Sequence, residues 1–304
     1  MNFDENNPPP PDPAQSPVPW EIIESQSPAE DSSAGASTNL PPDSGAAVAP
    51  LPEDLRVPWG WLDLLVIVAL FALGPVVLSL PIFLGFSIEG ITRAELSHPS
   101  SAQGLFVILD QVLLSLAILG YLAVQMRYRF RLPFWRTAGW RPLETRHTSR
   151  GLAYLGIFVG GFLFSLLVQF TSASFGTKAK LPIETLFENQ RNAILLMVMA
   201  VTIAPVFEET IFRGYIYPVL ARSFGVGASI IVTGTLFGLL HAVQLWGGWV
   251  QIGLMVVVGI VFTYVRSVTR TVVASYLLHL SYNSVPLLFY VIASHGFRQL
   301  PVGS

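Results

Sequence analysis

The stretch NAILLMVMAVTIAPVFEETIFRGYIYPVL, residues 192–220, decides the fold of this chain. It is apolar enough to cross a membrane, and its only charged side chains are Glu208, Glu209 and Arg213. A charge near the middle of a membrane span costs at least about 2.5 kcal/mol. We therefore expect these side chains to be paired, turned into the protein interior or functional.

Helical geometry separates the three charges. Glu209 and Arg213 are four residues apart, so they share a helix face and can neutralise each other. Glu208 lies about 100° further around the helix, where Arg213 is poorly placed to reach it. One carboxylate is thus predicted to be structural and the other free for chemistry. Pro205 leaves the carbonyl of Val201 without a partner, a break that membrane proteins tolerate inside protein or beside a wet cavity.

The composition of the chain indicates an integral membrane protein. Of its 304 residues, 52% are hydrophobic and 12% charged, and the mean hydropathy is +0.57. A soluble domain carries about 25% charged residues. The chain has no cysteine, which excludes disulfides, thiolate zinc sites, iron–sulfur clusters and a cysteine nucleophile.

The first part of the chain differs from the rest. Residues 1–56 hold twelve of the 23 prolines and ten acidic residues against one arginine. This composition cannot bury enough apolar surface to offset chain entropy, so it predicts a disordered tail. No basic segment precedes the first apolar run, and we therefore expect no cleaved signal peptide. Residues 57–298 are predicted to form the transmembrane domain.

Seven apolar runs of roughly the 20 residues that a bilayer core requires follow the tail. They predict an all-α, polytopic transmembrane bundle of seven spans, or eight if one of the longer runs breaks. The third run carries Gly156, Gly160 and Gly161, a spacing of small residues that suits close helix packing. The runs are residues 64–88, 105–125, 151–171, 192–222, 226–243, 248–265 and 271–293.

Arginine distribution predicts the orientation. Residues 126–150 hold seven arginines and one glutamate, so the positive-inside rule makes this loop cytoplasmic. Counting spans then puts the N-terminal tail, the turn near Arg222 and residues 266–270 on the same side. The loops near residues 89–103 and 172–191 are expected on the other side.

Two further spans each carry a histidine with a partner four residues away, on the same helix face. These pairs are Phe237 with His241 and His279 with Asn283. If the chain reverses at residues 223–225, Glu208 and His241 both lie about 25 Å from that turn. His279 and Asn283 lie about 16 and 22 Å from the next turn on the same side. All four polar residues are therefore expected to converge in one layer.

The chemistry of this set is hydrolytic. A buried carboxylate beside an imidazole can polarise a water molecule for attack on a carbonyl. A second imidazole with an asparagine amide offers hydrogen-bond donors to the oxyanion that develops. One glutamate and two histidines also resemble a catalytic zinc site of three protein ligands and a water. The residues alone leave both chemistries open.

The three patterns together resemble the CPBP family. They are Glu208-Glu209-x-x-x-Arg213, Phe237-x-x-x-His241 and His279-x-x-x-Asn283. The family comprises type II CAAX prenyl endopeptidases and similar bacterial bacteriocin-processing or immunity proteins, and the resemblance covers roughly residues 190–290. It implies an intramembrane endopeptidase that cleaves a membrane-associated protein or peptide. The alternative is a non-catalytic immunity or peptide-sequestering protein of the same fold.

The resemblance also implies roles for the site residues. Glu208 and His241 would activate water, and His279 and Asn283 would stabilise the oxyanion. Supporting roles fall to Glu209, Arg213 and Phe237. We expect no obligatory cofactor; if a metal is used, it is zinc held by Glu208, His241 and His279. The expected location is a bacterial cytoplasmic membrane with the tail inside, and the expected partners are the bilayer and the substrate, with no nucleic acid.

Overall fold

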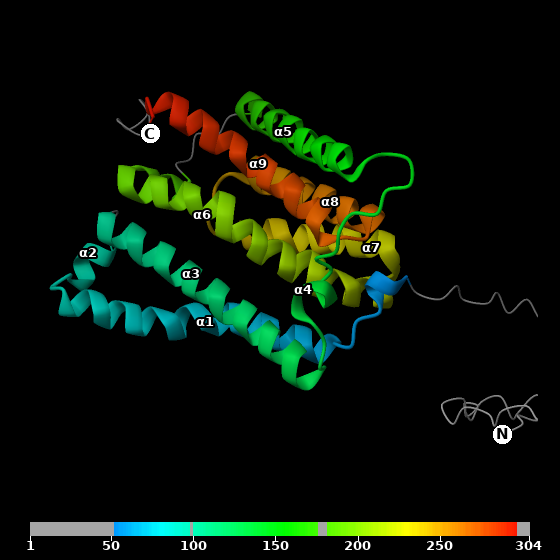
Figure 1. Ribbon diagram of the computed structural model, residues 1–304. Coiled ribbons are helices and arrows are strands. Elements are labelled where there is room, and N and C mark those ends of the chain that lie inside the picture. Colours follow the sequence, from blue (N-terminus) through cyan, green and yellow to red (C-terminus); the bar gives the residue numbers. More distant parts are fainter. Residues whose placement is uncertain (1–51, 98–99, 176–180, 297–304) are drawn as a thin grey trace, which may run out of the picture. The chain divides into compact units, whose positions relative to one another are not determined.

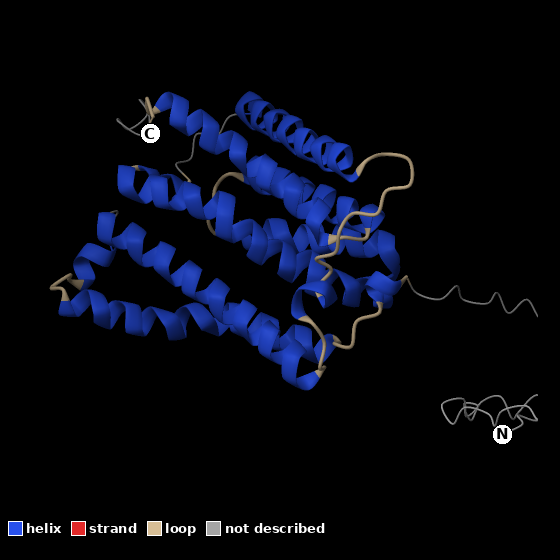
Figure 2. Ribbon diagram, viewed as in Figure 1, coloured by secondary structure: helices blue, strands red, loops and turns tan. Residues whose placement is uncertain are grey.

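A computed structural model of the protein describes residues 52–97, 100–175 and 181–296. All regular elements in these ranges are helical, as Figure 2 shows, so the predicted all-α class is confirmed. Residues 1–51 of the predicted tail lie outside the described residues. The elements are η1 (Glu53–Leu55), α1 (Trp61–Ile88), α2 (Arg93–Ser97), α3 (Ser101–Val124), η2 (Gln125–Arg129), α4 (Phe134–Thr137), α5 (Arg150–Phe175), η3 (Pro182–Phe187), α6 (Gln190–Glu209), η4 (Thr210–Ile216), α7 (Tyr217–Leu240), α8 (Trp249–Thr269) and α9 (Val272–Ala293).

Six helical runs in the described residues are long and apolar enough to cross a membrane. The longest, residues 190–240, contains a non-helical break at Gly225, with φ 78° and ψ 164°. Glycine adopts this backbone conformation without the steric cost that other residues incur. The ring centroids of Phe212 and Phe237, which lie on either side of the break, are 5.3 Å apart. This distance shows that the chain reverses at the break. Counting the two arms separately gives seven segments, consistent with the predicted spans.

Helices α1, α3, α6, α9 and α5 pack against one another in that order, as the ribbon shows (Figure 1). Helices α7 and α8 form a close pair, and α8 also contacts α9. Glycines make the α7–α8 approach possible: a Cβ on Gly238 would lie 2.6 Å from the backbone nitrogen of Val256. Gly234 and Gly259 face each other at the same crossing. Small residues at such crossings let two backbones approach closely.

The glycines of α5 behave differently from one another. A Cβ on Gly161 would lie 3.1 Å from the Cα of Leu278 and 3.1 Å from the Cβ of Ser281, both on α9. A Cβ on Gly156 or Gly160 would meet nothing within 4 Å. Close packing of α5 was predicted from all three glycines, but only Gly161 lies in close contact with another helix.

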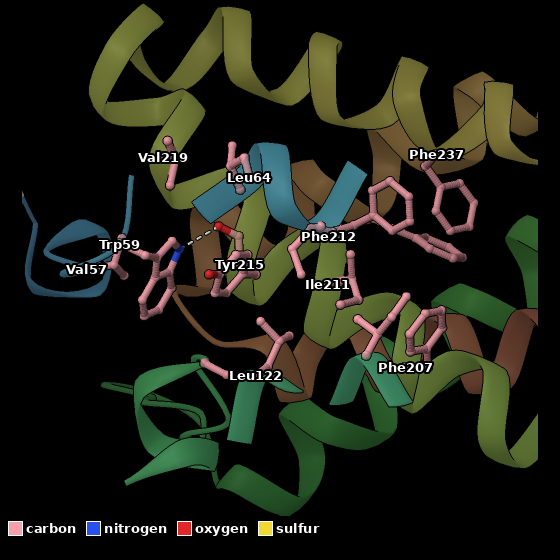
Figure 3. Packing of buried hydrophobic residues seen from close by; sticks show 14 of the residues in the cluster. Val57, Trp59, Leu64, Leu122, Phe207, Ile211, Phe212, Tyr215, Val219 and Phe237 are labelled. Carbon is pink, nitrogen blue, oxygen red and sulfur yellow. Dashed lines mark hydrogen bonds between the residues drawn. The ribbon is translucent and has the colours of Figure 1, made fainter. Parts of the chain in front are cut away.

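Aromatic side chains dominate the buried core around η4. Figure 3 shows Phe207, Phe212 and Tyr215 among the packed residues of this cluster. Trp59 stacks on Tyr215 with ring centroids 4.7 Å apart and donates a hydrogen bond of 2.9 Å to its carbonyl. The segment that precedes α1 is therefore part of the core.

Several segments distant in sequence meet at one end of the bundle, which we call the basic end. Asp54 pairs with Arg266 at 2.8 Å, and Glu53 pairs with Arg141 at 2.8 Å. These contacts join the N-terminal segment to the loop between α4 and α5 and to the end of α8. Leu55 is also buried. Residues 52–56, which the sequence analysis assigns to the tail, thus belong to the packed structure, because the charges of Glu53 and Asp54 are paired and Leu55 is buried.

The two turns predicted to lie on the same side as the arginine-rich loop are also at the basic end. Arg222 donates to the carbonyl of Val57 at 2.7 Å, and Val272 N donates to the carbonyl of Gly139 at 2.9 Å. The opposite end carries η3, where Ile183 N donates to the carbonyl of Gln244 at 3.1 Å. We call this the η3 end.

Candidate active site

The four residues predicted to be catalytic line one cavity of about 250 Å³ inside the bundle. Glu208 comes from the end of α6, His241 follows α7, and His279 and Asn283 come from α9. Phe237 also contributes to the wall. The antiparallel geometry and the matched depths predicted this convergence. The two charged supporting residues, Glu209 and Arg213, lie behind the wall and do not line the cavity.

Glu209 and Arg213 form a fully buried ion pair, as their four-residue spacing predicts. Arg213 Nη1 and Glu209 Oε1 are 3.0 Å apart, and both side chains are 0% exposed. The other guanidinium nitrogens donate to the carbonyl of Gly259 at 2.9 Å and to Thr263 Oγ1 at 3.3 Å. The guanidinium carbon also lies 4.6 Å from the ring centre of Phe237. A buried ion pair needs such additional partners, because desolvation otherwise outweighs the attraction of the charges.

His279 connects the two adjacent glutamates. Its Nδ1 lies 3.0 Å from Glu209 Oε1, and its Nε2 lies 3.7 Å from Glu208 Oε2. The oxygen of Glu209 that pairs with Arg213 therefore also fixes the ring of His279. The sequence analysis missed this contact, because it assigned Glu209 to Arg213 alone. The signal that would have indicated it is the adjacency of the two glutamates, which lets one carboxylate reach each nitrogen of a single imidazole.

His241 is oriented by its own helix. It stands at the C-terminal cap of α7, and its Nδ1 lies 2.9 Å from the carbonyl of Phe237. A carbonyl only accepts hydrogen bonds, so Nδ1 carries the proton. In the neutral ring, Nε2 is then the nitrogen that can accept a proton. The sequence analysis placed His241 across from Glu208, but the imidazole that contacts Glu208 is that of His279.

Asn283 joins α9 to α6. Its amide nitrogen donates to the carbonyl of Ala200 at 2.7 Å, in the turn that precedes Pro205. An amide nitrogen has two hydrogens, so one remains for another acceptor. The sequence analysis did not anticipate the amides Gln111 and Gln244, which also line the cavity. Single glutamines in apolar runs carry no motif that would indicate such a position.

The described residues do not form a ready zinc site. No three of their histidine, aspartate and glutamate side chains lie close enough together to hold a metal ion. Glu208 and His279 approach each other, but His241 does not join them, and one nitrogen of each imidazole is already bonded. We therefore derive no step through a metal, and metal dependence stays a prediction for experiment.

Long apolar helices around a cavity that holds ionisable side chains define a polytopic integral membrane protein. Residues 190–285 of the chain match the family model of type II CAAX prenyl endopeptidase Rce1-like proteins. This match confirms the resemblance indicated by the three motifs, over nearly the same residues. It contains all four predicted catalytic residues. No curated protein and no solved structure matches the chain.

Proposed function

We propose that this protein is an intramembrane endopeptidase that hydrolyses a peptide bond of a membrane-associated protein or peptide. The match to the Rce1-like family model supports a membrane endopeptidase of the CAAX protease type. The observation that carries the mechanism is the shared cavity of Glu208, His241, His279 and Asn283. Hydrolysis needs a base, a water position and donors for the oxyanion in one place, and this cavity offers groups for all three.

In the proposed reaction, the oxygen of a water molecule adds to the peptide carbonyl carbon. Glu208 accepts a proton from that water, and Nε2 of His241 accepts a hydrogen bond that holds the water in place. The carbonyl oxygen becomes an oxyanion, which accepts hydrogen bonds from the free amide hydrogen of Asn283 and from the imidazole of His279. The carbon–nitrogen bond then breaks, and Glu208 returns its proton to the leaving amine.

Glu209 and Arg213 act behind the cavity wall in this mechanism. Glu209 holds Nδ1 of His279, so that Nε2 faces the cavity beside Glu208. Arg213 balances the charge of Glu209 and ties it to α8 through Gly259 and Thr263. We further propose a bacterial cytoplasmic membrane as the location, with the basic end of the bundle on the cytoplasmic side.

Comparison of cells that express the wild type, Glu208→Gln or no protein tests this function. We expect new peptide termini among membrane proteins of the wild type only, detected by mass spectrometry of protein ends. Glu208→Gln keeps the side-chain shape and removes the charge, so equal expression in the membrane is the control. If cells without the protein differ in growth from wild-type cells, and Glu208→Gln cells grow like the wild type, a non-catalytic immunity or peptide-sequestering role would be supported instead.

A further inference from the structure

A second cavity of about 390 Å³ adjoins the candidate active site. We call it the antechamber. Its wall combines residues of α3, η3 and α6 with the residues that follow α7. The two cavities share five lining residues, which are Gln111, Ile183, Leu196, Met199 and Gln244. A molecule in the antechamber therefore lies directly beside the cavity that holds Glu208.

No charged side chain lies among the described lining residues of the antechamber. Its described lining residues are apolar side chains, a threonine and the three amides Gln103, Gln111 and Gln244. In the site cavity, Glu208 is the one acidic side chain and no lysine or arginine contributes to the described wall. A lysine or aspartate of a peptide bound in the antechamber would thus lose its hydration without gaining a partner of opposite charge among the described lining residues, which is costly.

The amides provide the polar contacts that an uncharged peptide needs. Gln103 and Gln111 lie on the same face of α3, eight residues apart, and Gln244 faces them from the segment after α7. Within the described part of the chain, none of the three amide groups forms a hydrogen bond with another residue. An amide both donates and accepts, so it can pair with the N–H and C=O groups of an extended backbone. This arrangement suits a peptide strand better than a purely apolar molecule.

The antechamber lies toward the η3 end of the bundle. Neither cavity is lined by residues 126–150, 222–225 or 266–271, which make up the basic end. On that side the site is backed by the buried rings of Phe207, Phe212, Phe237 and Phe262. The antechamber instead lies under η3, where Pro182, Ile183, Thr185 and Leu186 line it.

We propose that the substrate reaches the site from the η3 end, through the antechamber, as an extended peptide segment without charged side chains in the part that occupies the antechamber. This inference rests on the proposed function and adds the class of substrate and the side from which it binds. With the predicted orientation, that side faces away from the cytoplasm.

The absence of cysteine from the chain gives a direct test of access. Two single-cysteine variants are made, Gln111→Cys and Arg146→Cys. Gln111 lines both cavities, whereas Arg146 is exposed at the basic end. Both variants also carry Glu208→Gln, so that they bind the peptide without cleaving it. The probe is an uncharged decapeptide of alanine, valine, serine and glycine. At about ten times its Kd it should slow N-ethylmaleimide labelling of Gln111→Cys roughly tenfold, by occupancy alone. The same peptide with two central lysines should not, and Arg146→Cys should label equally throughout.

Equal protection by both peptides, protection by neither, or protection of Arg146→Cys would overturn the inference. A steric pair provides a second measurement if Gln111→Cys does not fold. Val107→Trp fills the antechamber and should raise the KM for the uncharged peptide, whereas Leu116→Trp on the exposed face of the same helix should not. Protection without cleavage by the wild type would contradict the proposed function alone. Cleavage of both peptides alike would contradict the inference alone.

Discussion

At the scale of single residues, two adjacent glutamates have different surroundings. Glu208 lines the cavity, and Nε2 of the His279 imidazole lies 3.7 Å from its Oε2. Glu209 is buried and shares one oxygen between Arg213 and His279, each at 3.0 Å. Removal of the charge should therefore affect activity at the first position and stability at the second.

Glu208→Gln should abolish cleavage while leaving stability close to that of the wild type. General acid–base groups contribute about 10²–10⁴-fold to rates, so we expect a loss of at least that order. Glu209→Gln leaves Arg213 buried without its counter-charge, which costs about 3–5 kcal/mol in known cases. The measurements are peptide cleavage and the Tm of the detergent-solubilised protein. Equal Tm values for the two variants would show that the buried ion pair does not stabilise the fold.

Metal removal tests the chemistry that the residues leave open. We expect purified protein to contain well under one zinc per chain and to keep its activity in a strong chelator. The contact between Glu209 and His279 is one that also orients metal-binding histidines, so it does not separate the two chemistries. Stoichiometric zinc, with activity lost on chelation and restored by zinc, would make Glu208, His241 and His279 its ligands.

The convergence of the four cavity residues could be predicted from the sequence. Charges and imidazoles inside apolar runs are costly, and fixed helical rise converts their spacing from turns into depth. The partners of these residues could not be predicted in the same way. The bond from His279 to Glu209 depends on the distance between α9 and α6, and that from Asn283 to Ala200 depends on the same packing. Spacing along one helix does not determine such distances.

At the scale of elements, two features of the long run after η3 differ in how far they could be predicted. The break at Gly225 matches the reversal expected at residues 223–225. The π-helical turn η4, which carries Arg213, was not predicted. A π-helical segment widens the helix locally within a continuous apolar run, so hydrophobic periodicity hardly records it.

Helix α5 offers a matched pair of glycines for the packing of α9, which carries His279 and Asn283. Gly161→Ala places a methyl group against the backbone of Leu278, so α9 must shift. We expect a lower Tm and lower cleavage activity. Gly160→Ala meets nothing within 4 Å, and alanine favours a helix over glycine by about 0.5–1 kcal/mol. A similar Tm for both variants would contradict the close contact between α5 and α9.

At the scale of the whole molecule, a short segment that precedes the first membrane helix is packed against the described bundle. Arg266 is 1% exposed, and Asp54 pairs with it at 2.8 Å. The guanidinium also lies 5.6 Å from the ring centre of Tyr217. Asp54 therefore supplies the counter-charge for an arginine that the helices bury.

Deletion of residues 1–50 should leave the Tm of the detergent-solubilised protein unchanged, because their composition cannot bury a core and Asp54 is retained. Asp54→Asn in the same shortened chain should lower the Tm, because it leaves Arg266 buried without its partner, at a cost of about 3–5 kcal/mol.

Glu53→Gln is the matched control for this prediction. Glu53 pairs with Arg141 at 2.8 Å, but its side chain is 75% exposed, whereas that of Asp54 is 8% exposed. An exposed ion pair contributes about 0–1 kcal/mol, so Glu53→Gln should change the Tm little. Burial, rather than the mere presence of a salt bridge, then decides which of two neighbouring acids anchors the segment. A large fall in Tm on deletion of residues 1–50 would show instead that the tail contributes to the packed structure.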